Sequence, residues 1–119
     1  LLCWFLAQQQ RCNGYENHLW NGMTTLCLAK ILLRIIEQDL WQPNTMHIHS
    51  DDISKYQLLC ELSRVYQKQI EIVPTAAPIG KDMRLRSQHG NWLAQLEIPP
   101  LLQQLEELPN YTDSAGRWR

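Results

Sequence analysis

The sequence predicts an α/β fold in which short strands alternate with helices. Two long segments, residues 24–40 and 54–68, carry apolar residues at helical spacing. Two short segments have the pattern of strands: residues 46–49 alternate between apolar and polar side chains, and residues 70–73 are rich in β-branched side chains. Prolines separate the segments and mark their boundaries.

Composition indicates one globular domain without a nucleic-acid or membrane partner. The 119 residues are 45% hydrophobic and 19% charged, with a formal net charge of -1, so no basic surface is expected to attract nucleic acid or anionic lipid. The longest apolar stretch, Leu1 to Ala7, is too short to span a bilayer and has no basic leader. The chain opens inside this stretch without Met, so we expect a preceding segment.

The four cysteines form no Cys-x-x-Cys pair. Cys27 and Cys60 lie among apolar residues at helical spacing, where a free thiol behaves as a small hydrophobe. We therefore expect buried thiols in a reducing, cytoplasmic protein, although disulfides stay open.

The first 40 residues predict a helix, a polar stretch and a longer helix. Residues 1–10 are apolar and then Gln-rich, as in a helix or the end of one. The stretch Cys12–Trp20 contains Asn13-Gly14, which predicts a turn. The helix from Thr24 to Leu40 can be capped by a threonine hydroxyl at its start.

This long helix is apolar around most of its circumference. Its polar residues, from Lys30 to Gln38, fall on one narrow face. Such a helix must be covered on more than one side, and a chain this small offers little to cover it. We therefore expect a missing layer.

The middle of the chain predicts strand, helix and strand. Met46–His49 alternates like a short strand. Ser54-Lys55-Tyr56-Gln57 has the form of a capping box at the start of a helix that reaches Lys68. Its apolar stripe consists of Leu58, Leu59, Leu62, Val65 and Tyr66. Ile70–Val73 is the next strand, which Pro74 should stop.

The last third predicts a loop, two helices and a tail. Residues 75–87 form an irregular loop, and residues 87–96 a short helix broken near Gly90. Pro99-Pro100 suits a helix start, with Leu101, Leu102, Leu105 and Leu108 as the buried stripe. Residues 110–119 are left as a frayed tail.

Several motifs in order resemble the C-terminal region of extended short-chain dehydrogenase/reductases. The nearest branch is the sugar-nucleotide reductases similar to dTDP-4-dehydrorhamnose reductase. Each motif alone is common, but the ordered set covers nearly the whole chain. The motifs are Leu1–Leu6, Asn13–Leu26, Leu28–Lys30, His47–Ser50 and Ile53–Leu59.

The resemblance implies a parent enzyme with an N-terminal Rossmann part that binds NAD or NADP. Residues 1–109 would be its C-terminal, substrate-binding part, which closes over a nucleotide sugar. The five glycines are too scattered for a Gly-rich phosphate turn. No tyrosine has a lysine four residues later, so the family's catalytic pair and cofactor loop would lie in the missing part.

The resemblance also indicates substrate-binding residues. Asn17, Trp20 and Asn21 could line the sugar pocket, although a tryptophan beside a strand is more often core. Arg84 and Arg86 could grip the pyrophosphate, because a guanidinium suits phosphate oxygens; a solvated basic loop is equally favoured. The sequence departs from relatives that carry arginines at the positions of Trp20 and Met83.

Two polar patterns, a group of histidines and a pair of aspartates, are explained without a catalytic role. His47-x-His49, with His89, resembles a metal site but has no acidic or cysteine partner at ligand spacing, so we expect no metal. Asp51-Asp52 suits the negative charge favoured at a helix N-terminus. We assign neither pattern to catalysis.

The leading hypothesis is a substrate-binding fragment of an NAD(P)-dependent nucleotide-sugar reductase or epimerase in polysaccharide precursor synthesis. The alternatives are a non-catalytic sugar-nucleotide-binding module and a small α/β interaction domain. Whether the chain forms oligomers stays open at this stage.

Overall fold

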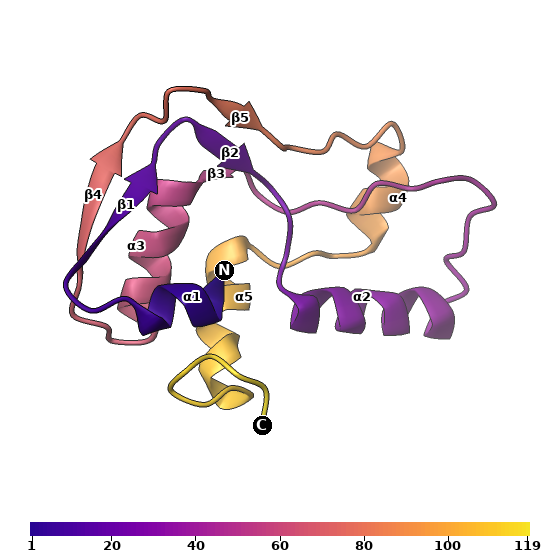
Figure 1. Ribbon diagram of the computed structural model, residues 1–119. Coiled ribbons are helices and arrows are strands. Elements are labelled where there is room, and N and C mark those ends of the chain that lie inside the picture. The colour runs from indigo at the N-terminus through magenta and orange to yellow at the C-terminus, as the bar shows by residue number, and fades with distance from the viewer.

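The computed structural model describes all residues from 1 to 119 and confirms a mixed α/β fold. Figure 1 shows its elements in chain order. They are α1 (Leu2–Ala7), β1 (Arg11–Tyr15), β2 (His18–Trp20), α2 (Thr25–Glu37), β3 (Ile53–Ser54), α3 (Lys55–Val65), β4 (Glu71–Thr75), β5 (Lys81–Asp82), α4 (Gly90–Gln95), α5 (Leu101–Glu107) and a final 3₁₀ turn, Leu108–Asn110.

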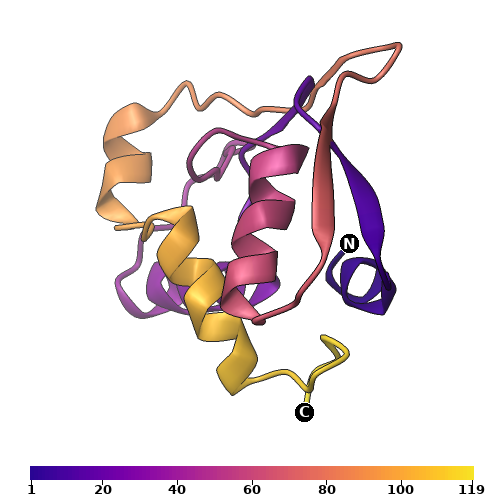
Figure 2. The same cartoon turned by 90° about the vertical axis from the view of Figure 1, so that its left-hand side faces the viewer.

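The strands form two small sheets. β1 and β4 pair in parallel, in register from Arg11↔Glu71 to Tyr15↔Thr75. The second sheet has the order β3-β2-β5, in which β2 is antiparallel to β3 and parallel to β5. In Figure 2, α3 lies between the β1–β4 sheet and α5. The result is a layered arrangement of sheet, helix and helix at one end of the molecule.

The main core forms around α3. Its capping box is present as predicted: the Ser54 hydroxyl accepts from the Gln57 N–H, and the Gln57 side chain accepts from the Ser54 N–H. This cap fixes where the helix begins and so which face meets the sheet. The buried residues of this core are Phe5, Cys12, Leu58, Leu59, Leu62, Leu101, Leu105 and Leu108.

A second, smaller core joins α2 to α4. Thr24 caps α2 by accepting from the Cys27 N–H, as predicted, and the buried cluster consists of Cys27, Ile31, Ile35, Trp92 and Leu96. The opposite side of α2 is open, with Leu28, Leu32, Leu33 and Ile36 all exposed. Nothing in this chain supplies the second cover that the sequence predicts.

Two predicted elements are wrong. Asn13-Gly14 lies inside β1 and forms no turn. A Cβ on Gly14 would stand 2.7 Å from Cδ2 of Tyr56, so this glycine serves the close packing of strand against helix. Residues 46–49 form no strand, and β3 lies later, where Ile53 and Ser54 find a partner in β2.

Pro74 does not stop its strand, because β4 continues to Thr75. The Glu71 N–H donates to Gln10 and the Glu16 N–H donates to the Thr75 carbonyl. Backbone groups alternate along a strand, so the nitrogen of Pro74 points away from β1. A proline is tolerated at such a position.

Residues 110–119 fold back on α1 instead of fraying. The Asp113 carboxylate accepts from the N–H groups of Ala115 and Arg117, both at 2.9 Å. Gly116 has a φ of +75°, and a Cβ there would lie 2.8 Å from the Leu2 side chain. A side chain is therefore excluded where the tail crosses α1. None of the helices has the length and apolarity to cross a membrane.

Candidate functional site

The candidate site lies beyond the carboxyl ends of β1 and β4. In open α/β sheets, ligands bind at that edge. Here the chain leaves Tyr15 for β2 and leaves Thr75 for β5, and the two connections meet where β2 pairs with β5. A cavity of about 530 Å³ opens beside them. Its lining residues are Leu1, His18, Trp20, Ile53, Ser54, Lys55, Leu58, Lys81 and Met83.

The cavity combines an apolar wall with positive charge. Trp20, Leu58 and Met83 provide apolar surface, and Lys55 and Lys81 provide the cations. A ligand with a flat ring next to an anionic group matches this pattern. Its ring can stack on Trp20 while the two lysine ammonium groups pair with the anion. A nucleoside diphosphate has both features.

Aromatic rings hold Lys55 in place. Its Nζ lies 5.2 Å from the ring centre of Trp4 and 5.4 Å from that of Tyr15. Both distances fall within the range of cation–π attraction. The Tyr15 ring also lies 4.7 Å from the ring of His18. The ammonium group at the cavity is therefore positioned by one ring from α1 and one from the end of β1.

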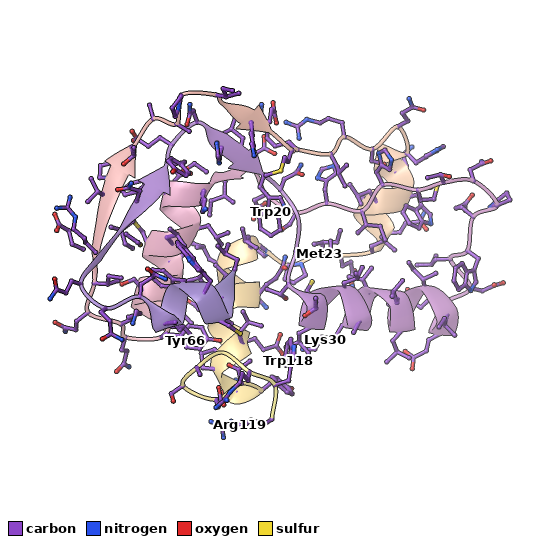
Figure 3. The ribbon with its side chains drawn as sticks, viewed as in Figure 1. Trp20, Met23, Lys30, Tyr66, Trp118 and Arg119 are labelled. Carbon is purple, nitrogen blue, oxygen red and sulfur yellow. The ribbon has the colours of Figure 1, made fainter.

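Trp20 serves both the cavity and the core. It lines the cavity and also packs against the main core cluster; Figure 3 shows it pointing into the middle of the molecule. A Cβ on Gly22 would lie 2.2 Å from Cζ2 of this ring. The Trp-Asn-Gly sequence is thus constrained by the space the indole occupies.

The amides of Asn17 and Asn21 bind backbone. Asn17 donates to the Ala77 carbonyl and accepts from the Ala77 N–H, both at 2.8 Å. Asn21, which is fully buried, does the same with Leu85, again at 2.8 Å. Each amide therefore uses one donor and one acceptor on the segment that follows β4.

Arg84 and Arg86 are held by carboxylates beside the cavity and are not among its lining residues. Arg84 contacts Asp82 at 2.7 Å and Asp52 at 3.1 Å, and Arg86 contacts Asp52 at 2.9 Å. The Arg84 guanidinium holds the pKa of Asp82 well below its usual range. Hydrogen bonds from Arg86, and then from Arg84, lower the pKa of Asp52.

Sequence reasoning missed Lys55 and Lys81. The sequence contains one indication for Lys55, which lies in the first turn of α3, where the helix dipole disfavours a cation. A lysine at such an unfavourable position indicates a role other than stabilising the helix. Lys81 had no such signal, because it reaches the cavity only through the pairing of β5 with β2.

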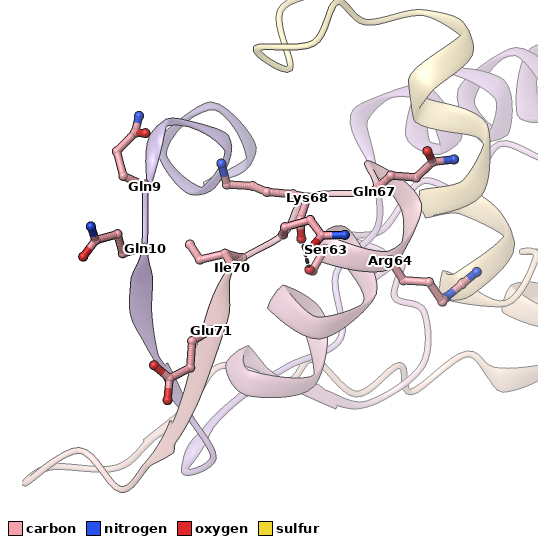
Figure 4. A pocket seen from close by; sticks show the side chains of 9 residues that line it. Gln9, Gln10, Ser63, Arg64, Gln67, Lys68, Ile70 and Glu71 are labelled. Atoms are coloured by element: carbon pink, nitrogen blue, oxygen red, sulfur yellow. Dashed lines mark hydrogen bonds between the residues drawn. The ribbon is translucent and has the colours of Figure 1, made fainter.

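A second hollow lies at the opposite, amino ends of β1 and β4 (Figure 4). It has a volume of about 680 Å³ but contains one hydrophobic residue, Ile70, and no aromatic ring. Its other lining residues are Gln9, Gln10, Ser63, Arg64, Gln67, Lys68, Gln69 and Glu71. It offers no stacking surface for a base or sugar, so we assign the site to the Trp20 cavity. No three His, Cys, Asp or Glu side chains gather as metal ligands.

Comparison with known proteins shows a partial likeness to reductases. No protein-family model and no curated protein sequence matches the chain. The structure is similar to dTDP-4-dehydrorhamnose reductase from Bacillus anthracis in complex with NADP (TM-score 0.69, 11% identity), with 89% of this chain and 40% of that one covered. The enzyme from Clostridium acetobutylicum is similar over 83% of this chain and 38% of that one (TM-score 0.67, 17% identity).

The enzyme from Yersinia enterocolitica is similar over 85% of this chain and 38% of that one (TM-score 0.63, 17% identity). The chain thus spans about two fifths of the length of the reductases it matches. The resemblance predicted from the sequence is confirmed at the level of the fold.

Proposed function

We propose that this chain is the C-terminal, substrate-binding part of an NAD(P)-dependent nucleotide-sugar reductase or epimerase that acts in polysaccharide precursor synthesis. The observation that carries the proposal is the Trp20 cavity, with its apolar wall and two lysines at the carboxyl ends of β1 and β4, in a fold shared with dTDP-4-dehydrorhamnose reductases. The four free thiols accord with a reducing cytoplasm, where we place the enzyme.

Each site residue has a role that its chemistry favours. Trp20 would stack on the base or sugar, and Lys55 and Lys81 would pair with the diphosphate. Arg84 and Arg86 would reach a phosphate by exchanging their contacts with Asp52 for contacts with the ligand. The exposure of Arg86 and the partial exposure of Arg84 on the segment beside the cavity support such an exchange.

The residues present do not fit a dinucleotide. The connection from β2 to α2 contains one glycine, Gly22, and the ring of Trp20 fills the space above it. A pyrophosphate cradle needs a glycine-rich turn that is open to the ligand. We therefore assign NAD or NADP, which supplies the hydride when bound, to another part of the enzyme.

The edge of the β1–β4 sheet supports a Rossmann part as the partner. Parallel sheets occur almost only with several strands and both faces covered, yet this one has two strands. The β4 edge carries Pro74, which blocks further pairing. The outer edge of β1, formed by the backbone of Arg11, Asn13 and Tyr15, has no such block and meets no strand. We propose that β1 continues the sheet of the cofactor-binding part.

Calorimetry on the full natural polypeptide that carries this sequence tests the proposal, with dTDP-glucose and UDP-glucose as probes. We expect binding of at least one probe, and Lys55→Ala should weaken it about tenfold, the loss of one charge-assisted contact. Lys30→Ala is the matched control, because Lys30 pairs with Glu107 away from the cavity. Absence of binding by the wild type would exclude the proposed function.

A turnover assay on the same polypeptide separates the proposal from its alternative, a non-catalytic module. A reductase would oxidise NADPH with a dTDP-4-keto sugar, and an epimerase would interconvert two nucleotide sugars without net oxidation of the cofactor. A module that only binds would do neither. The small interaction domain would bind neither probe.

A further inference from the structure

The segment of residues 76–90 has no buried residue. Its large apolar side chains, Ile79, Met83 and Leu85, are all exposed. Hydrophobic burial is the dominant favourable term in folding, but it contributes little to holding residues 76–90 in place. The segment nevertheless supplies Lys81 and Met83 to the cavity wall.

Backbone pairing holds the middle of the segment. The Lys81 N–H donates to the Asn17 carbonyl and the Met83 N–H donates to the Leu19 carbonyl, both at 2.9 Å. These bonds accompany the pairing of β5 with β2, which extends over only two residues of each strand. A parallel ladder this short is weak by itself.

The Asn17 and Asn21 amides extend this ladder at both ends. Asn17 binds Ala77 through both its amide groups, and Asn21 binds Leu85 in the same way, with all four distances at 2.8 Å. A primary amide presents the same donor and acceptor as a peptide group. The two side chains thus act as additional rungs, four residues apart in sequence, at either end of the nine residues from Ala77 to Leu85.

We propose that Asn17 and Asn21 are positioning residues that fix this segment and thereby place Lys81 and Met83 in the cavity wall. The inference rests on the proposed function for the ligand, but the holding of the segment does not. Asparagine suits the task because aspartate would lose the donor and alanine would lose both contacts. Ligand affinity then depends on Asn17 through Lys81, without direct contact between Asn17 and the ligand.

Hydrogen exchange of the peptide that covers residues 76–87 tests the holding directly, in the full natural polypeptide and without ligand. Asn17→Ala should speed exchange there on the order of tenfold, because two hydrogen bonds are lost, and leave α3 unchanged. Asn44→Ala is the control: Asn44 is exposed and lies in a loop far along the sequence. Asn21→Ala should act at the Leu85 end, with circular dichroism to confirm folding because Asn21 is buried. Unchanged exchange in Asn17→Ala would overturn the inference and leave the proposed function intact.

A double-mutant cycle tests the link to binding, with dTDP-glucose and UDP-glucose as probes. Asn17→Ala should weaken binding severalfold in the wild type and have little further effect in a Lys81→Ala background. Equal losses in both backgrounds would overturn the positioning role. Faster exchange with unchanged affinity would also overturn it. If the wild type binds neither probe, the proposed function fails and the binding role of the pair fails with it.

Discussion

The two ends of the molecule cover their long helices differently. At one end, which we call the strand lobe (α1, β1, β4, α3 and α5), α3 has the sheet on one side and α5 on the other. At the other end, the helix lobe (α2 and α4), α2 is covered by α4 and adjoining loops on one side only. In the strand lobe α3 is therefore covered on both sides, whereas in the helix lobe one face of α2 is exposed.

This difference shows how much a helix's own sequence reveals about its surroundings. In α3 the apolar residues form one stripe, and that stripe is buried. In α2 the apolar residues extend past the buried stripe to Leu28, Leu32, Leu33 and Ile36, and Ile36 is 60% exposed. A contiguous apolar face of this kind marks an interaction surface. The two basic side chains of α2 do not fold over this face, because Lys30 pairs with Glu107 and Arg34 binds the Leu96 carbonyl.

The largest effect should come from a cavity in the strand lobe. Leu59 is fully buried at the centre of the main core, so Leu59→Ala should reduce the free energy of unfolding by about 3–4 kcal/mol. Leu102→Ala, on an exposed position of α5, should change it by less than about 0.5 kcal/mol. Urea denaturation of the two variants measures both values. A similar cost for the two would mean that the strand lobe is not tightly packed.

The second effect concerns the joint between the lobes. The Gln104 side chain is buried and accepts from the Thr24 N–H at 3.1 Å, while it donates to Ser50 and to the Pro99 carbonyl. Gln104→Ala should lower stability by about 2 kcal/mol, because three partly buried partners lose their hydrogen bonds. Hydrogen exchange should then rise more in α2 than in α3, and Gln103→Ala should have neither effect. Equal rises in both helices would show that the lobes unfold as one unit.

The sequence predictions are accurate where a feature depends on neighbouring residues and fail where it depends on residues far along the chain. The caps at Thr24 and Ser54 depend on residues three positions away, and both were predictable. The predicted turn at Gly14 is wrong because the constraint on this glycine comes from Tyr56, 42 positions later in the chain. Trp20, which the sequence indicates as a pocket residue, lines the cavity, whereas Lys81 depends on strand pairing that no local pattern encodes.

The apolar face of α2 should change self-association more than stability. Leu33→Lys with Ile36→Lys places charge on exposed positions, so the free energy of unfolding should change by less than about 0.5 kcal/mol. Association of the isolated 119-residue chain, measured by sedimentation, should fall in this variant. Ile35→Lys is the contrasting variant, because Ile35 is buried and a lysine there should unfold the helix lobe. A wild-type chain that is monomeric and binds no apolar dye would show that this face needs no cover.

The smallest effect is a faster hydrogen exchange of residues 82–87, the stretch that contains Arg84 and Arg86, in acid. Arg84 lowers the pKa of Asp82, and Arg86, followed by Arg84, lowers that of Asp52. A carboxylate with a lowered folded-state pKa stabilises the fold fully above its ordinary pKa of about 4 and loses that contribution as the pH falls through the lowered value. Exchange of residues 82–87, corrected for its intrinsic rate, should therefore be constant from pH 8 to 5 and rise below about pH 4. In Asp52→Asn the rise should be smaller, since one of the two titrating groups is gone. Because these pairs are exposed, 1 M salt at pH 7 should weaken them as well. If neither acid nor salt alters exchange, the Asn17 and Asn21 amides hold the segment without help from the ion pairs.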